Sequence, residues 1–289
     1  MKPPPFEYED PATVDDVLGL LAEHGEGAKV LAGGQSLVPL LNFRLAAPDR
    51  LIDLGGVAGL QACAPEDGGL RVGAMVRHRA LERGLAGERA PLLGLVAPHI
   101  GHPQIRTRGT LGGSLAHADP AAELPAAVVA LDGEIEVRSR RGSRTVPAEQ
   151  FFVSFFTTVL EPDELLVAVR IPAQPDGTGF GFEEAAVRPG DFALAGAAAA
   201  VTVGADGSIE RARIACLAAG STPLRLHEVE EALLGHRPSE ALWQDAEVRT
   251  RERVEPPEDV HASAGYRRRV AGVLVRRALA RAVPERAAA

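Results

Sequence analysis

Residues 106–123 read Arg-Thr-Arg-Gly-Thr-Leu-Gly-Gly-Ser-Leu-Ala-His-Ala-Asp-Pro-Ala-Ala-Glu, and the rest of the chain is organised around them. Gly112 and Gly113 stand here between two hydroxyl residues, Thr110 and Ser114. A glycine pair lets a ligand approach the backbone and permits positive φ, and the N–H groups of such a turn can converge on an anion. Taken alone, one glycine pair is more simply interpreted as an ordinary turn.

A second copy of this pattern makes a binding loop the better interpretation. Ala32-Gly33-Gly34-Gln35-Ser36 follows an amphipathic segment and a short apolar run at residues 30–32. Two such loops can hold the two ends of one phosphorylated ligand. Neither matches the G-x-G-x-x-G fingerprint, and G-x-x-x-x-G-K-[ST] occurs nowhere, so the sequence supports neither a Rossmann site nor a P-loop.

Length and charge exclude several classes of protein. The 289 residues are enough for two domains with separate cores. A formal charge of −8 argues against binding to nucleic acid or to anionic membranes, since both select a basic face. No apolar run is long enough to span a membrane and the N-terminus does not resemble a signal peptide, so we expect a cytoplasmic protein.

The two cysteines, Cys63 and Cys216, limit the redox centres that the chain can carry. They cannot provide the four thiolates of an iron–sulfur cluster, and nothing suggests a disulfide framework. We expect both to be small buried residues. Any iron–sulfur centre that works with this chain must therefore lie on another chain.

A linker rich in proline and glycine, at residues 174–179, separates two expected domains. The first, residues 1–175, alternates helical and strand patterns over a small lobe at about 1–55 and a larger lobe at about 56–175. The second, residues 176–289, has three strand patterns followed by helical ones. The expected fold is α+β: two α/β lobes, then a C-terminal domain with a three-stranded antiparallel sheet and a helix bundle.

Local signals place the individual elements. Helices are expected after the caps Thr13 and Ser263, and after Thr222-Pro223, because proline fits the first helical position. The other expected elements are strands at 29–32, 51–54, 70–74, 134–137, 144–146, 165–171, 179–187, 194–203 and 209–218, and helices at 38–45, 76–83, 90–100, 121–131 and 240–253.

Potential metal ligands gather in one region of the sequence: His99, His102, His117 and Asp119. They include no helical i, i+4 pair and no ligand order typical of zinc, so we expect no metal. Ser114, His117 and Asp119 could be taken for a hydrolase triad. Residues this close on one loop seldom reach the required geometry, and the G-x-S-x-G elbow is absent here. We therefore expect no catalytic side chain.

The two glycine loops also carry a resemblance to a known family. Residues 32–36 resemble its A-G-G-[HQ]-S element, and residues 110–114 resemble its T-[IL]-G-G-[SN] element. The family comprises the FAD-binding medium subunits of molybdenum hydroxylases, such as carbon monoxide dehydrogenase and xanthine dehydrogenase. The resemblance runs nearly end to end, through residues 102–106, 116–120, 188–193 and 266–268. It implies a PCMH-type FAD-binding fold for the first domain and a carbon monoxide dehydrogenase flavoprotein type for the second.

The resemblance also implies where FAD binds. Two loops would bind the FAD diphosphate and the groups next to it. They contain Leu31, Ala32, Gly33, Gly34, Gln35, Ser36, Leu37 and Val38 in the first loop, and Thr110, Gly112, Gly113 and Ser114 in the second. Glu123 occupies a position where the family commonly has an acidic residue in contact with FAD. Ile100 and Leu166 occupy positions of apolar contacts with FAD, and Leu166 would form a wall beside a ring system. Gln35 replaces a histidine of many relatives; because it is non-nucleophilic, we expect non-covalent FAD. Glu183 replaces a lysine of some relatives, so that contact can be lost or reversed in charge.

The implied function is that of an electron-transfer subunit. Electrons would pass from a molybdopterin centre on a large partner, through [2Fe–2S] clusters on a small partner, to FAD on this chain and then to an external acceptor. The resemblance implies a dimer of such heterotrimers, in which this chain alone oxidises no substrate. A self-contained flavin oxidoreductase and a scaffold with a decayed flavin site are the alternatives. Carbon monoxide, an aldehyde and an N-heterocycle stay open as substrates of the complex.

Overall fold

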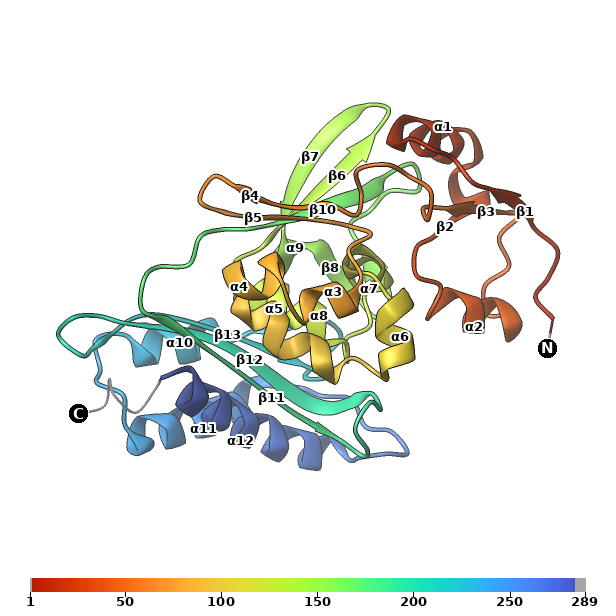
Figure 1. Cartoon of the computed structure of the whole chain (residues 1–289). Helices are drawn as coiled ribbons and strands as arrows, with labels where there is room; N and C mark the ends of the chain where they lie inside the picture. The colour runs from red at the N-terminus through yellow and green to blue at the C-terminus, as the bar shows by residue number, and fades with distance from the viewer. Residues whose placement is uncertain (1, 284–289) are drawn as a thin grey trace.

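The computed structural model describes residues 2–283. Figure 1 shows a small N-terminal lobe beside a stack of four layers, in which a sheet, a layer of helices, a second sheet and a second layer of helices follow one another. The first two layers form the larger lobe, and the last two form the C-terminal domain. The α+β class expected from the sequence is confirmed, with two lobes followed by a sheet-and-helix domain.

The small lobe contains a parallel sheet of three strands in the order β1-β3-β2. Thr13 caps the first helix as predicted, because its hydroxyl accepts a hydrogen bond from the Asp16 N–H at 3.2 Å. The buried face of this helix, which includes Leu18 and Leu21, packs in one core with Ile52. The elements are β1 (Glu7–Glu9), α1 (Val14–His24), η1 (Gly25–Gly27), β2 (Ala28–Leu31), α2 (Leu37–Asn42) and β3 (Arg50–Asp53).

The larger lobe contains an antiparallel sheet of five strands in the order β4-β5-β10-β6-β7. Its strands are β4 (Cys63–Glu66), β5 (Gly69–Gly73), β6 (Glu134–Ser139), β7 (Gly142–Pro147) and β10 (Leu165–Ile171), and a hairpin of β8 (Phe152–Ser154) and β9 (Thr157–Thr158) lies apart from them. The central strand β10 has the bounds that the sequence predicts. β4 was not predicted, because its segment is rich in turn residues and contains Pro65; an edge strand tolerates proline.

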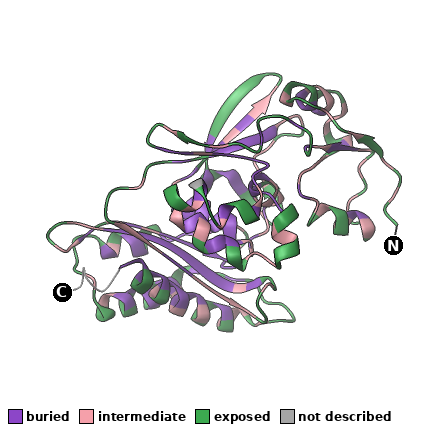
Figure 2. Cartoon of the chain, in the orientation of Figure 1, coloured by how far each residue is buried: buried purple, intermediate pink, exposed green. Residues whose placement is uncertain are grey.

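Short helices fill the layer between the two sheets (Figure 1). They are α3 (His78–Leu81), α4 (Leu85–Arg89), α5 (Pro91–Val96), η2 (Ala97–His99), α6 (Pro103–Arg108), α7 (Leu111–His117), α8 (Glu123–Ala130) and α9 (Ala148–Phe151). All residues of α8 are buried, as Figure 2 shows in the middle of the molecule. The cause is its position, since α8 contacts α5 and α7 of its own lobe and also the sheet of the C-terminal domain.

The C-terminal domain contains an antiparallel sheet of four strands, β11 (Thr178–Ala186), β12 (Ala193–Val203), β13 (Ile209–Leu217) and β14 (Leu224–Arg225), with helices α10 (His227–Leu233), α11 (Glu240–Arg253) and α12 (Ala264–Ala282). The prediction of three strands omitted β14, which occupies the segment where Thr222-Pro223 was expected to open a helix. Ser263 caps α12 as predicted, accepting from the Tyr266 N–H at 3.3 Å. The outer face of α11 and α12 is exposed in Figure 2.

An ionic network joins the two domains at the end of α8. Asp132 accepts hydrogen bonds from Arg211 at 2.7 Å, Arg213 at 2.8 Å and Arg225 at 2.8 Å, all three in the C-terminal domain. The Arg225 side chain is buried and also binds Glu230 and the carbonyl of Val129. Burial alone would raise the pKa of Asp132, but the three arginines lower it to about 2.

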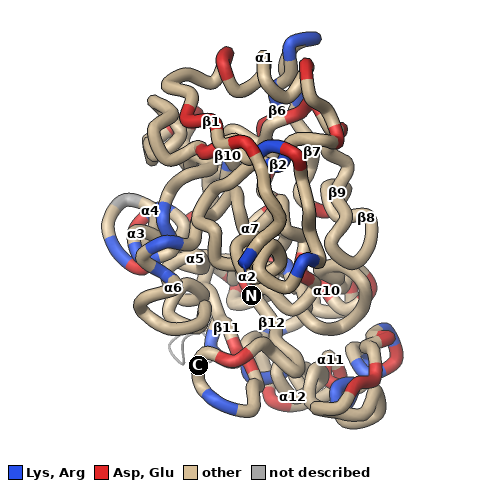
Figure 3. Tube along the Cα trace, turned by 90° about the vertical axis from the view of Figure 1, so that its right-hand side faces the viewer, with Lys and Arg blue, Asp and Glu red and all other residues tan. Residues whose placement is uncertain are grey.

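Charged residues of both signs are scattered over the molecule, as Figure 3 shows from one side. None of the helices within residues 2–283 combines the length and the apolar character that a membrane crossing requires.

Candidate functional site

The two glycine loops meet in space although they lie far apart in the sequence. The first follows β2 in the small lobe, and the second precedes α7 in the larger lobe (Figure 1). A Cβ placed on Gly33 would lie 2.3 Å from the carbonyl oxygen of Arg108 and 2.9 Å from the Cα of Gly109. Only glycine allows this approach, so Gly33 is the point at which the first lobe closes on the second loop.

The first loop offers a row of free hydrogen-bond donors. Within residues 2–283, no backbone carbonyl accepts from the N–H groups of Gly33, Gly34, Gln35 and Ser36. Gly34 has a φ of 74°, which turns the chain into α2, and the Gln35 amide folds back onto the Gly33 carbonyl at 3.3 Å. Consecutive free N–H groups at a turn are the donor set that an anion such as a diphosphate requires.

The flanking residues of the first loop have mixed exposure. Leu31 and Ala32 are half-buried, and Ala32 packs against the small-lobe core; Leu37 is half-buried in α2, and Val38 is exposed. The Val38 N–H donates to the Gly34 carbonyl at 3.1 Å, which closes the loop. The walls of the site can therefore be shaped by Leu31, Ala32, Leu37 and Val38. The free donors are the backbone N–H groups of the four residues between them.

Most N–H groups of the second loop already have partners, some within the loop and some in the segment that follows β5. Thr110 caps α7, its hydroxyl accepting from the Gly113 N–H at 3.1 Å, and the Gly112 N–H donates to the Ala74 carbonyl at 2.8 Å. Gly112 is buried, and a Cβ on it would lie 2.6 Å from the Cβ of Ala74. Its absent side chain thus permits close packing of α7 on the end of β5. Gly113 is turned toward the first loop, where its added Cβ would lie 3.3 Å from that of Ala32.

Positive charge lies beside the junction of the loops at a residue that the sequence analysis did not identify. Arg77 donates from Nη1 to the Arg108 carbonyl, the same oxygen that Gly33 approaches. Burial and the nearby charge of Arg108 lower the pKa of Arg77, while Asp53 opposes them. Two guanidinium groups near one loop favour an anionic ligand.

Two carboxyl groups, the buried Glu123 and the half-buried Glu184, lie where α8 begins. Glu123 is 8% exposed, and burial raises its pKa to about 7. Burial and the charge of Glu123 raise the pKa of Glu184 to about 8, and Glu184 Oε2 has no partner among the described residues. The end of β13 also meets this turn, since the Ala218 N–H donates to the Pro120 carbonyl at 2.7 Å. The sequence offered no signal that distinguishes Glu184 from its acidic neighbour.

That neighbour, Glu183, faces the opposite side of the sheet, since successive residues of a strand point in opposite directions. Its carboxylate pairs with Arg281 of α12 at 2.5 Å. The structure therefore places Glu183 against the helix layer, whereas Glu184 is near Glu123.

The two apolar residues lie in the core of the larger lobe. Leu166 is 4% exposed within β10, and Ile100 is half-buried and packs against the same cluster. The Ile100 carbonyl accepts from Arg106 at 3.2 Å. Leu166 is thus a rigid part of the core, while Ile100 lies in the turn that leads to α6.

The histidines do not converge in the structure. The His99 ring packs edge-on against Phe182 at 4.9 Å between centroids, and the His117 ring lies 5.1 Å from that of Phe156. Asp119 accepts from the Ala121 N–H at 2.9 Å and so fixes a turn. Within residues 2–283, no three His, Cys, Asp or Glu side chains form a group that could hold a metal ion.

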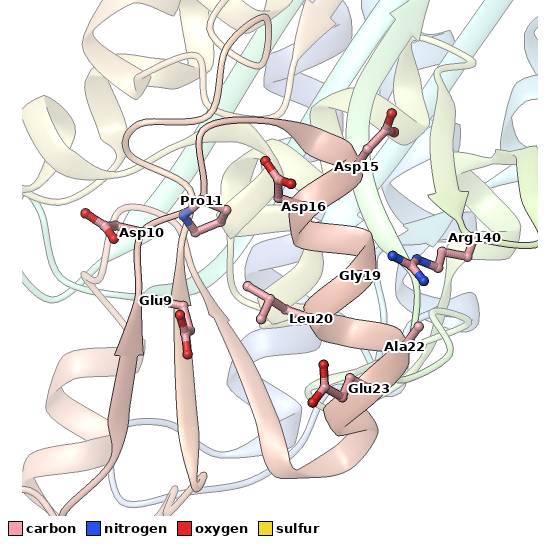
Figure 4. A pocket seen from close by; sticks show the side chains of 10 residues that line it. All are labelled: Glu9, Asp10, Pro11, Asp15, Asp16, Gly19, Leu20, Ala22, Glu23 and Arg140. Atoms are coloured by element: carbon pink, nitrogen blue, oxygen red, sulfur yellow. The ribbon is translucent and has the colours of Figure 1, made fainter.

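An open cavity of about 710 Å³ lies elsewhere, beside α1 (Figure 4). Five carboxylates and one guanidinium line it: Glu9, Asp10, Asp15, Asp16, Glu23 and Arg140. None of the residues expected to contact FAD belongs to it. An acidic lining repels an anion such as a diphosphate, so this cavity suits an anionic ligand less well than the glycine loops do.

The carboxyl pair gives a stability prediction that depends on pH. A carboxyl whose pKa rises from 4.5 to about 8 on folding contributes stability that is complete below pH 4.5 and is lost as the pH rises through 8. Glu184→Gln, which stays neutral, should change the free energy of unfolding by less than about 1 kcal/mol at pH 5. At pH 9 the substitution should raise the free energy of unfolding by about 1–3 kcal/mol. This is less than the full ~1.4 kcal/mol per unit of pKa shift, because Glu184 keeps some solvent contact.

Urea denaturation at the two pH values would measure this effect. Glu258→Gln, at an exposed position, is the matched control. Its effect on the free energy of unfolding should be the same at both pH values. An equal change in Glu184→Gln at pH 5 and pH 9 would show that the carboxyl titrates normally in the folded protein.

Comparisons with known proteins agree along the whole chain. The model of the FAD binding domain in molybdopterin dehydrogenase matches residues 4–174, and that of the CO dehydrogenase flavoprotein C-terminal domain matches residues 180–282. The chain is 43% identical to 6-hydroxypseudooxynicotine dehydrogenase complex subunit alpha of Paenarthrobacter nicotinovorans, covering 98% of this chain and 96% of the relative. It is 41% identical to caffeine dehydrogenase subunit beta of a Pseudomonas strain, with the same coverage.

Solved structures give the same result. A carbon monoxide dehydrogenase structure from Hydrogenophaga pseudoflava contains a chain that superimposes with a TM-score of 0.95 at 37% identity, over 100% of both chains. Sequence, domain order and fold thus agree, and the chain belongs to the family of FAD-binding medium subunits of molybdenum hydroxylases.

Proposed function

We propose that this chain binds FAD non-covalently across its two glycine loops. The observation that carries the proposal is the row of free N–H groups from Gly33 to Ser36, at the place where the first loop meets the second. Backbone amides can hold a diphosphate in a protein whose net charge is negative. Arg77 adds positive charge beside them, and the hydroxyls of Ser36 and Ser114 add donors on the two sides.

The remaining predicted contacts belong to the same proposal. Thr110, Gly112 and Gly113 shape the second loop, while Leu31, Ala32, Leu37 and Val38 flank the first. Ile100, Leu166 and Glu123 belong to the larger lobe, where a ring system would lie. Glu183 is the weakest member, because its pairing with Arg281 turns it toward α12. Gln35 is a neutral amide hydrogen-bonded to its own loop, and it offers no nucleophile for a covalent bond.

Bound FAD supplies the redox chemistry, and the protein supplies binding, orientation and electrostatics. Since the two cysteines cannot ligate a cluster, the electrons must come from another chain. We infer a small [2Fe–2S] partner as the donor, a large molybdopterin partner that oxidises the substrate, and a cytoplasmic dimer of heterotrimers. The names of the relatives, which include subunits of nicotine-type and caffeine dehydrogenases, favour an N-heterocyclic substrate over carbon monoxide.

Release of the flavin tests the proposal directly. Acid treatment of the yellow chain should liberate intact FAD, since no covalent link is expected, and FMN should not replace it because two loops imply a ligand with two ends. An artificial reductant should bleach the flavin, whereas the chain alone should oxidise no organic substrate. Flavin that stays with the denatured protein, or a chain that rejects FAD, would contradict the proposal. Sustained turnover by the chain alone would favour a self-contained oxidoreductase.

A further inference from the structure

His78 lies beneath the second glycine loop and contacts it from the core side. It is the first residue of α3 and is 6% exposed. Its backbone N–H donates to the Gly109 carbonyl at 3.0 Å, and its Nε2 lies 2.8 Å from the Thr110 carbonyl oxygen. The ring also packs on Gly109, where a Cβ would lie 2.7 Å from Cε1 and Nδ1. One histidine thus binds both residues that precede α7.

The protonation state of His78 follows from these contacts. A carbonyl oxygen only accepts hydrogen bonds, so Nε2 carries the hydrogen. Nδ1 is buried and has no partner among the described residues. Burial lowers the pKa of His78 to about 4 against the opposing effect of the Thr110 bond, and the charges of Arg106 and Arg77 add to the lowering. At neutral pH the ring is therefore uncharged and donates one hydrogen bond, to Thr110.

Thr110 links His78 to both loops. Its carbonyl also accepts from the Ser114 N–H at 3.0 Å, and its hydroxyl caps α7 through Gly113. On its other side, the backbone of residues 108–109 touches Gly33 of the first loop. We propose that His78 is a positioning residue of the flavin site, which through Thr110 holds the segment 108–110 against Gly33 and so keeps the two loops together. This inference rests on the proposed function, because the site that it positions is the FAD site.

A residue that merely fills the core would act through its volume, whereas a positioning residue acts through its donor. Two substitutions separate these roles. His78→Gln and His78→Met have side chains of similar length, but only glutamine carries an N–H that can reach the Thr110 carbonyl. In the full-length chain, His78→Met should weaken FAD binding at least about tenfold per folded protein, which is about 1.4 kcal/mol. His78→Gln should stay within about threefold of the unaltered chain.

Two further measurements separate the role of His78 from a general loss of stability and from FAD binding itself. Val229→Ala, in the core of the C-terminal domain, should lose stability through a cavity and keep its FAD affinity. In the flavin-free chain, amide hydrogen exchange over residues 108–115 should accelerate in His78→Met and not in His78→Gln. If His78→Met does not fold, His78→Asn, whose amide is too short to reach Thr110, replaces it.

The outcomes separate the two proposals. Equal FAD affinity in the methionine variant and the unaltered chain, or equal losses in the methionine and glutamine variants, would overturn the role of His78. An unaltered chain that binds no FAD would overturn the proposed function, while the hydrogen-exchange contrast would still decide whether His78 holds the loop.

Discussion

Gly33→Ala should lower the affinity for FAD by about 100-fold or more, which corresponds to about 2.7 kcal/mol. The added Cβ would lie 2.3 Å from the Arg108 carbonyl oxygen, and a backbone oxygen cannot rotate away as a side chain can. The two loops must therefore separate, and the free N–H groups of the first loop move away from Gly113 and Ser114. Overpacking of this kind costs about 1–3 kcal/mol even where neighbours relax. Titration of the folded apoprotein with FAD would measure the loss.

Gly56→Ala is the matched control for this experiment. Gly56 lies just after β3, the last strand of the small lobe, and the nearest atom to its added Cβ is the Pro11 carbonyl oxygen at 3.9 Å, an ordinary contact. Its FAD affinity should equal that of the unaltered chain. If Gly33→Ala also retained full affinity, the contact between the loops would have no part in binding.

Arg225→Met should destabilise the protein by about 3–5 kcal/mol, the usual cost of removing one partner from a buried ionic group. Arg225 is almost fully buried and binds Glu230, Asp132 at 2.8 Å and the Val129 carbonyl at 3.0 Å. Glu230 also accepts a hydrogen bond from the Ile214 N–H at 2.7 Å, which holds its carboxylate in place. In the variant this buried negative charge would lack the guanidinium that balances it. The midpoint of urea denaturation should fall accordingly.

Arg249→Met provides the comparison on the surface. Arg249 pairs with Asp245 one turn away on α11, and both side chains are about half exposed. Exposed pairs contribute little to stability, so the midpoint should hardly move. A similar shift in both variants would mean that the network between the domains is no stronger than a surface pair.

Periodicity and local capping were sufficient to predict much of the fold. β10 and α11 have the predicted bounds, and Thr13 and Ser263 cap the predicted helices, because these features depend on neighbours in the sequence. The helix predicted to open at Thr222-Pro223 begins later, as α10 at His227. Residues 224–225 instead pair with the preceding strand β13 as β14, and a strand of two residues is too short to show an alternating pattern in the sequence.

The candidate site was predictable in its loops but not in its details. Gly112 and Gly113 are equivalent in sequence, yet Gly112 faces Ala74, whereas Gly113 faces the Thr110 hydroxyl and Ala32. Glu184 was missed because its direction depends on which face of β11 is covered by α12. His78 was missed because its partner is a backbone carbonyl far along the chain, and a backbone carbonyl has no sequence signature.

The burial of α8 on every side bears on how this family can be rearranged in evolution. The helix lies within the segment matched to the FAD-binding domain, yet one of its faces is covered by the sheet of the second segment. Separated at the linker, the first segment would present that apolar face to water and would invite aggregation. The first segment therefore depends on the second to cover α8, and a rearrangement that separates the two would have to replace that cover.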